Sequence, residues 1–178
     1  MRSLRVKLAA VVAVVAVGAV GAVAVAHDRS SFAGFLSGYE EVPAVSTTGN
    51  GTFRAAVNRA ETEIKWELTY SKLEGTVQQA HIHFGQESVN GGIVAFLCSN
   101  LGNGPTGTET CPPPPARIGG TIKATEVTDR AAAQGITTGE LAELVRAMRA
   151  GVTYANVHST TWPSGEIRTQ VTSHEGRR

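Results

Sequence analysis

Two short stretches of this sequence place histidines where they could bind a metal ion. In Ala80-His81-Ile82-His83-Phe84-Gly85, apolar residues alternate with two histidines, and a similar alternation leads to His158 in Tyr154-Ala155-Asn156-Val157-His158-Ser159. Successive side chains of a β-strand point to opposite faces, so each stretch would carry its imidazoles on the face away from its apolar side chains. Imidazole is a ligand of copper and zinc, and an i, i+2 spacing lets two rings converge on one ion. His81, His83 and His158 are therefore candidate metal ligands.

The same residues also have a structural interpretation. Each neutral imidazole offers one hydrogen-bond donor and one acceptor, so the three rings and Asn156 would also suit a polar cluster that joins neighbouring strands. Glu166 and Arg168 follow on the next stretch, and we count them with Asn156 as a structural polar cluster. They would form an ion pair beside the rings or belong to a solvated charged face. The residue types leave both interpretations open.

Other catalytic chemistry has little support in the sequence. There is no Gly-x-Ser-x-Gly elbow and no P-loop, and Asp28 and Asp129 are the only aspartates. Glu40 and Glu41 are consecutive, so in an extended segment their side chains would point apart, and we expect them to be surface charges. We name no catalytic residue and no organic cofactor, and expect a non-catalytic protein.

The first 26 residues have the pattern of a secretory signal peptide. Arg2, Arg5 and Lys7 precede an apolar run from Leu8, and Ala24-Val25-Ala26 is a small-x-small cleavage site. The alternative is an uncleaved membrane anchor, because the run is about long enough to span a bilayer. Cleavage would leave a short mature N-terminal segment (27–30), one domain (31–172) and a polar tail (173–178), in a protein that is secreted or held at the cell exterior.

The charge of the chain excludes some partners. The formal net charge is +1, and removing residues 1–26 would make it slightly acidic, because that segment holds only basic charges. No Lys/Arg-rich run would remain, so nucleic acid and membrane surfaces are poor partners for the mature chain. The remaining candidates are an extracellular protein or a small ligand.

Cys98 and Cys111 are the only cysteines. An even pair in an exported protein favours a disulfide, which would close a Gly/Pro/Thr-rich loop and stabilise the fold by about 3 kcal/mol. A thiol metal site is the alternative. The tetraproline Pro112–Pro115 that follows suits a rigid loop wall or a proline-motif ligand.

The remaining pattern predicts an all-β chain with one helix. Alternating or apolar runs bounded by turn residues predict strands over 32–37, 52–58, 62–70, 77–84, 93–97, 116–125, 154–159 and 166–172. The pair 52–58 and 62–70 should form a hairpin. Leu141, Leu144, Val145 and Met148 form an apolar stripe, which predicts an amphipathic helix at about 138–150 with Thr137 as N-cap and Glu140 completing a capping box.

These segments together resemble the CHRD domain, which is named from chordin and stands alone in many secreted bacterial proteins. The resemblance is carried by the opening Leu36–Pro43, by His-x-His-x-Gly at 81–85, by Gly151–Ser159 and by Gly165-Glu166-Ile167-Arg168. It implies an antiparallel β-sandwich or barrel of immunoglobulin-like character and a secreted setting. It implies no activity, and we expect a non-catalytic binding or structural module.

A second resemblance concerns the metal. His-x-His followed by Phe-Gly, with a later Val-His, is similar to the copper-binding strands of copper/zinc superoxide dismutase, which is also a β-sandwich. It implies copper or zinc at His81, His83 and His158, and less strongly a redox enzyme. The zinc-loop residues and a clear fourth copper histidine are missing, although His27 and His174 are candidates.

Overall fold

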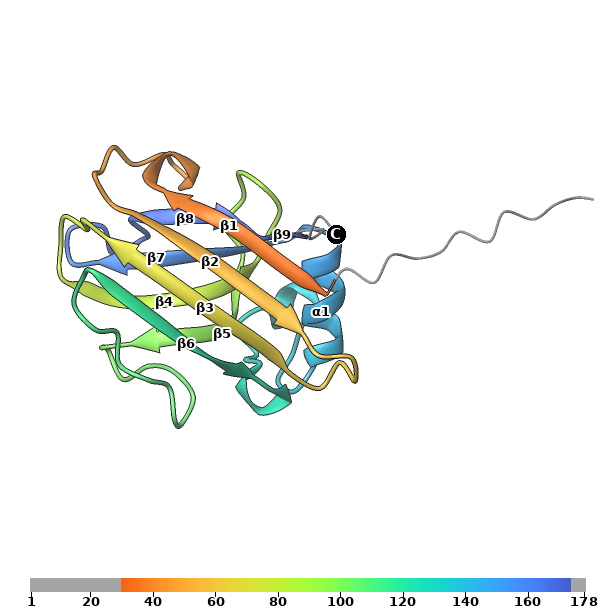
Figure 1. The fold of residues 1–178 in the computed structure, drawn as a ribbon. Coiled ribbons are helices and arrows are strands. Elements are labelled where there is room, and N and C mark those ends of the chain that lie inside the picture. Colours follow the sequence, from red (N-terminus) through yellow and green to blue (C-terminus); the bar gives the residue numbers. More distant parts are fainter. Residues whose placement is uncertain (1–29, 174–178) are drawn as a thin grey trace, which may run out of the picture.

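The computed structural model describes residues 30–173 (Figure 1). The predicted signal peptide, the two candidate ligands His27 and His174, and the tail after Ser173 lie outside the described residues. The predictions made for them are untested by the structure.

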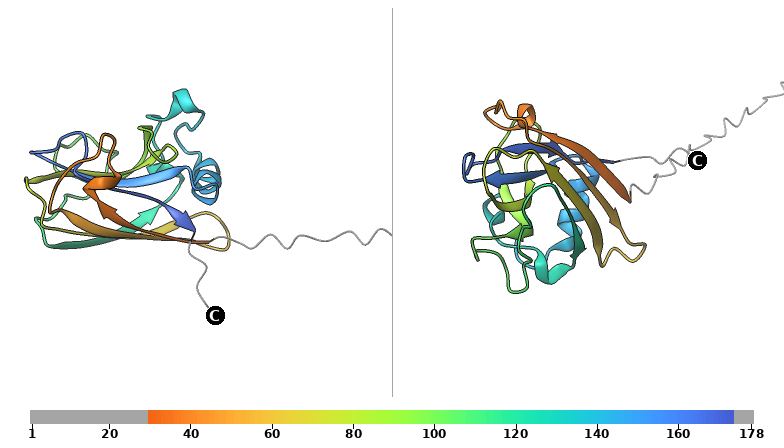
Figure 2. Two further views of the ribbon diagram at one scale, coloured as in Figure 1. Left: turned by 90° about the horizontal axis from the view of Figure 1, so that it is seen from above. Right: turned by 60° about the vertical axis from the view of Figure 1, so that its left-hand side comes forward.

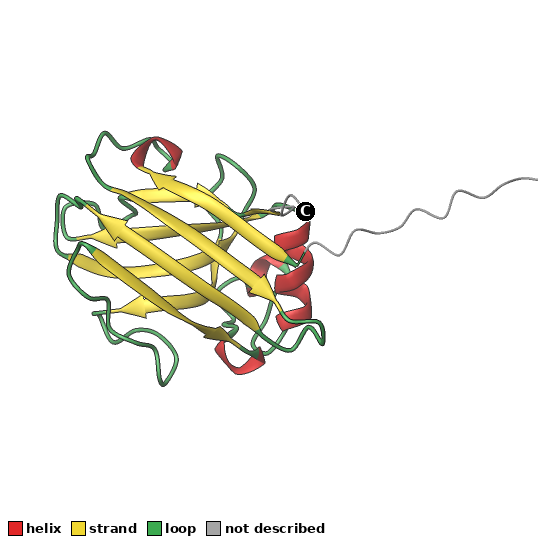
Figure 3. Ribbon diagram, viewed as in Figure 1, coloured by secondary structure: helices red, strands yellow, loops and turns green. Residues whose placement is uncertain are grey.

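The described chain is an antiparallel, nearly closed β-barrel or sandwich of nine strands, which confirms the predicted fold class. The strands are β1 (Ser31–Ser37), β2 (Asn50–Val57), β3 (Ile64–Ser71), β4 (Val77–Phe84), β5 (Gly92–Ser99), β6 (Ala116–Ile122), β7 (Thr153–Ser159), β8 (Ile167–Gln170) and β9 (Thr172–Ser173). Their order is β5-β4-β7-β8-β1-β2-β3-β6, with β9 paired to β1. Figures 1 and 3 show β1, β2, β3 and β6 as one layer in front of β8, β7, β4 and β5.

The front layer follows directly from the alternating sequence. β2 and β3 form the predicted hairpin, with Phe53 opposite Leu68 and both side chains fully buried. Arg54 lies opposite Glu67 on the outer side of the same pair. One face of this layer is apolar and the other carries charge, as an antiparallel sheet permits.

The back layer is buried on both faces. Ala80 and Ile82 of β4 point into the apolar core, as predicted, and β4 pairs with β7 so that His81 lies opposite Asn156. The histidine side of β4 is also covered, because His81 is 0% and His83 7% exposed. Residues far apart in the chain thus meet in an interior polar layer outside the core.

The helix is shorter than predicted. α1 spans Leu141–Arg149 and packs its apolar stripe into the core at one end of the two layers (Figure 2). Thr137 and Glu140 do hydrogen-bond, since the Thr137 hydroxyl and backbone N–H both donate to the Glu140 carboxylate. Gly139 has a φ of +88°, which breaks the helical path, so this contact closes a turn and Glu140 is the N-cap.

Two strand ends also differ from the prediction. β6 stops at Ile122, and a 3₁₀ turn η2 (Ala124–Glu126) follows in place of the strand's last residues. The final strand is divided at Val171 into β8 and β9, with Val171 itself fully buried. Two further 3₁₀ turns, η1 (Gly38–Glu40) and η3 (Ala132–Gln134), complete the fold.

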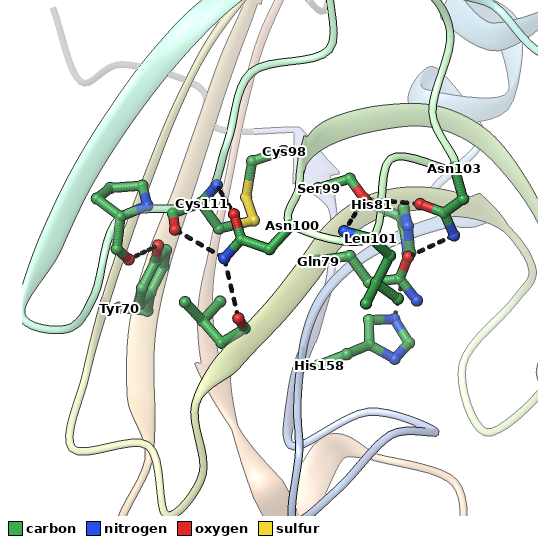
Figure 4. Close-up of a disulfide and its surroundings, with 12 residues drawn as sticks. Tyr70, Gln79, His81, Cys98, Ser99, Asn100, Leu101, Asn103, Cys111 and His158 are labelled. Carbon is green, nitrogen blue, oxygen red and sulfur yellow. Dashed lines mark hydrogen bonds between the residues drawn. A yellow bond between two sulfur atoms is a disulfide. The ribbon is translucent and has the colours of Figure 1, made fainter.

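The disulfide predicted from the cysteine pair is present and joins the two ends of the strand order. Cys98 lies in β5 and Cys111 precedes β6. These are the two edge strands of the sheet, and the barrel is not closed between them. Asn100 holds the loop by donating to Cys111 O and accepting from Cys111 N, as Figure 4 shows. Because both thiols are used, the alternative of a thiol metal site is wrong.

Candidate metal centre

The three predicted histidines converge. His81 and His83 come from β4 and His158 from β7, and one ring nitrogen of each lies within 4.8 Å of the other two. The closest contact joins His81 Nδ1 and His158 Nε2 at 3.2 Å (Figure 4). An ion bound about 2.0–2.1 Å from each of two nitrogens holds them about 3.3 Å apart at a tetrahedral angle. This pair therefore already has the separation that a shared ion requires.

Backbone carbonyls determine which nitrogens carry protons. His83 Nδ1 lies 2.9 Å from Gly91 O, and His158 Nδ1 lies 3.0 Å from Pro163 O. A carbonyl oxygen can only accept, so in both rings Nδ1–H is the donor and neutral Nε2 keeps its lone pair. Histidines that ligate metals are commonly held by such a hydrogen bond from their second nitrogen.

Burial keeps all three rings neutral at physiological pH. Desolvation is the largest cause in each case: it lowers the pKa of His81 to about 2 and that of His83 to about 4, and it lowers the pKa of His158. Neighbouring imidazoles and the positive charge of Arg130 add to the effect on His81. Neutral imidazole is the form that binds metal, so protons do not compete for these nitrogens near pH 7.

Asn156 stands between two of the rings. Its Oδ1 lies 3.1 Å from Nε2 of His83 and 3.1 Å from Nε2 of His158. His81 Nε2 is buried and has no hydrogen-bond partner among the described residues. The centre thus collects more acceptors than donors.

Aromatic and cationic side chains form the walls. The His83 ring stacks on Tyr154, and the Arg168 guanidinium lies 3.4 Å above the Tyr154 ring on its other side. The His81 ring meets Phe96 edge-on, with Arg130 over Phe96. These contacts restrict the rotamers of two candidate ligands, as a preorganised site requires.

Arg168 and Glu166 belong to the interior but do not pair with each other. Arg168 is 1% exposed and donates to Asn90 Oδ1 and to the carbonyls of Gln86 and Val89, which fastens the loop after β4. Glu166 is fully buried, and its Oε1 accepts from Thr47 Oγ1 and from the Glu74 backbone N–H. The ion-pair interpretation and the solvated-face interpretation are therefore both wrong: each residue anchors a separate loop.

Glu41 is the residue that the sequence interpretation missed. It was expected to be a surface charge but is only 6% exposed, and burial raises the pKa of its carboxyl to about 7. The positive charge of Arg168 and hydrogen bonds from Val42 and Asn156 oppose that rise. The signal that could have found it was its place in the Leu36–Pro43 opening that carries the family resemblance.

The geometry defines an antiparallel β-sandwich domain with a buried cluster of three histidines. The family model of the CHRD domain matches residues 32–171, and the chain belongs to the CHRD domain family. No curated protein and no solved structure gives a match. Within residues 30–173, none of the helices has the length and apolar character needed to cross a membrane.

Proposed function

We propose that this protein is a CHRD-domain module that binds one copper or zinc ion through His81, His83 and His158. The observation that carries the proposal is the convergence of three ring nitrogens, two of them in rings whose proton is committed to a carbonyl outside the centre. His83 and His158 each donate Nδ1–H to a carbonyl, so their Nε2 lone pairs face the centre. A cation placed there would satisfy them.

The ligand set suits a borderline metal. Imidazole nitrogen is bound well by Cu(II) and Zn(II), whereas Ca²⁺ and Mg²⁺ prefer oxygen. The carbonyl contacts and the stacked walls supply the orientation that a ligand shell needs. The rings are buried, so we propose binding and not turnover of a redox substrate.

The purified full chain tests this directly. We expect mass spectrometry of native protein, or titration of chelator-treated protein with Zn(II) and Cu(II), to give about one equivalent. His83→Ala should abolish the binding. Gln79→Ala, on the same strand, is the matched control and should retain it.

No bound ion and no thermal shift with either metal would overturn the proposal. In that case a rotated Asn156 amide supplies the missing donors, one N–H to Nε2 of His83 and one to Nε2 of His158. The cluster would then be a structural joint between β4 and β7.

A second candidate function is a non-catalytic binding module for an extracellular protein. It is supported by two aromatic side chains left exposed near the start of the domain, Phe35 at 64% and Tyr39 at 76%. Large aromatic residues are the usual anchors of protein interfaces. The double variant Phe35→Ser, Tyr39→Ser should no longer bind the protein partner but should still bind the metal ion.

We also propose that the chain is exported, with cleavage after Ala26 leaving residues 27–30 ahead of the domain. The basic start, apolar run and Ala24-Val25-Ala26 site support this. The disulfide supports it as well, because such bonds persist in oxidising compartments. The intact mass of protein recovered from the producing cells distinguishes cleavage from a retained anchor.

A further inference from the structure

Glu41 lies beside Asn156, next to the histidine cluster but outside its ligand set. Its carboxyl lies close enough to Asn156 to be influenced by the amide, and Asn156 is the residue whose Oδ1 faces His83 and His158. Its Oε1 is buried without a hydrogen-bond partner, and none of the ion pairs of the described residues includes it. The wall behind it is Gly165, where an added Cβ would come within 2.3 Å of Oε1. The fold thus makes room for a buried acid beside the proposed metal centre.

A divalent ion at the centre would lack a counter-charge without this acid. The three proposed ligands are neutral, and positive charges of neighbouring side chains act on two of them: Arg130 acts on His81, and Arg168 acts on His83. Placing a further positive charge in a buried site is costly unless an anion accompanies it. Among the described residues, Glu41 is a buried carboxyl that lies beside Asn156 and so next to the rings.

The Asn156 amide can link metal binding at the histidines to ionisation of the Glu41 carboxyl. In the orientation seen, Oδ1 faces the ring nitrogens and the amide N–H faces the Glu41 carboxyl, which suits an ionised carboxylate. Rotated by half a turn, the amide would donate to the two Nε2 atoms and accept from a protonated carboxyl. With Oδ1 toward the rings, the two Nε2 lone pairs are free to bind a metal. With the amide rotated, both lone pairs accept hydrogen bonds from Asn156 instead.

We propose that Glu41 is the charge-balancing acid of the three-histidine centre and gives up one proton to solvent when a divalent ion binds. The inference rests on the proposed metal binding. One M²⁺ enters, one carboxylic O–H bond breaks, and the carboxylate stays in place against Asn156. No oxidation or reduction is involved.

The groups that face Glu41 favour this assignment. Arg168 from β8 stabilises the carboxylate, while Tyr154 from β7 stays neutral because burial raises its pKa. Glu40, the adjacent acid, is exposed. Burial lowers the pKa of all three histidines, to about 4 in the case of His83.

Proton release on Zn(II) binding tests the inference. Calorimetric titration of the metal-free full chain in two buffers of different ionisation enthalpy counts the protons. We expect about one released per zinc at pH 6 and almost none at pH 8. The apparent affinity should rise about tenfold per pH unit up to pH 7 and then level.

Glu41→Gln should abolish the proton release, flatten the pH profile and weaken zinc binding at pH 8 by about tenfold or more. Glu40→Gln is the matched control and should behave as wild type. If wild type binds zinc without releasing a proton at pH 6, or if Glu41→Gln releases the same number, the inference is overturned while the metal site stands. If wild type binds neither zinc nor copper, both proposals fail.

Discussion

Glu41→Gln should make the metal-free protein more stable at neutral pH and leave its stability near pH 4.5 unchanged. The pKa of this carboxyl is raised from its ordinary 4.5 to about 7, chiefly by burial. Between these values the unfolded chain has lost the proton and the folded chain keeps it. Within this range, the free energy of unfolding therefore falls by about 1.4 kcal/mol for each unit by which the pH rises.

The size of the effect follows from the width of that window. Below pH 4.5 both states hold the proton and there is no loss; above pH 7 both have released it and the loss is complete at roughly 3 kcal/mol. Glutamine has nearly the same shape and never ionises, so the Glu41→Gln variant keeps the free energy of unfolding that wild type loses as the pH rises. At 6% exposure, Glu41 has little solvent screening to reduce this figure.

Urea unfolding with chelator present, at pH 4.5 and at pH 7.5, measures the difference. We expect wild type and Glu41→Gln to agree at the lower pH and to differ by up to about 3 kcal/mol at the higher one. Glu40→Gln, at an exposed position, should match wild type at both. An equal difference at both pH values, or a less stable Glu41→Gln at pH 7.5, would refute the reasoning.

Two more predictions concern stability. The pKa of His81 is lowered to about 2 and that of His83 to about 4, so between pH 6.5 and 4.5 only the unfolded chain gains protons on them. Acidification should therefore reduce the free energy of unfolding by at least about 1 kcal/mol per pH unit in wild type, and more steeply in Glu41→Gln, where the opposing carboxyl is gone. A urea series at pH 6.5, 5.5 and 4.5 shows this, and a flat wild-type profile would contradict it. Reduction of Cys98–Cys111, which closes a loop of sequence separation 13, should cost about 3 kcal/mol. Urea midpoints with and without reductant measure that cost, and coinciding midpoints would show that the Asn100 contacts suffice.

Local sequence patterns were enough to predict most of the elements. Alternation placed Phe53 and Leu68 on one face, and β4 has the predicted bounds of Val77–Phe84. A period of two forces such a strand to bury one set of side chains. The predicted start of the helix was wrong because Gly139 adopts a left-handed conformation, which the capping pattern does not reveal.

The sequence by itself determined which histidines could share a face, because strand geometry alternates residue by residue. It could not determine that β4 pairs with β7, which brings His81 against His158 from 77 positions away. Nor could it show that this face is covered and that Glu41 reaches it from the turn after β1. Burial and long-range strand pairing belong to the whole fold, and they alone bring three separate imidazoles together and bury Glu41 beside Asn156.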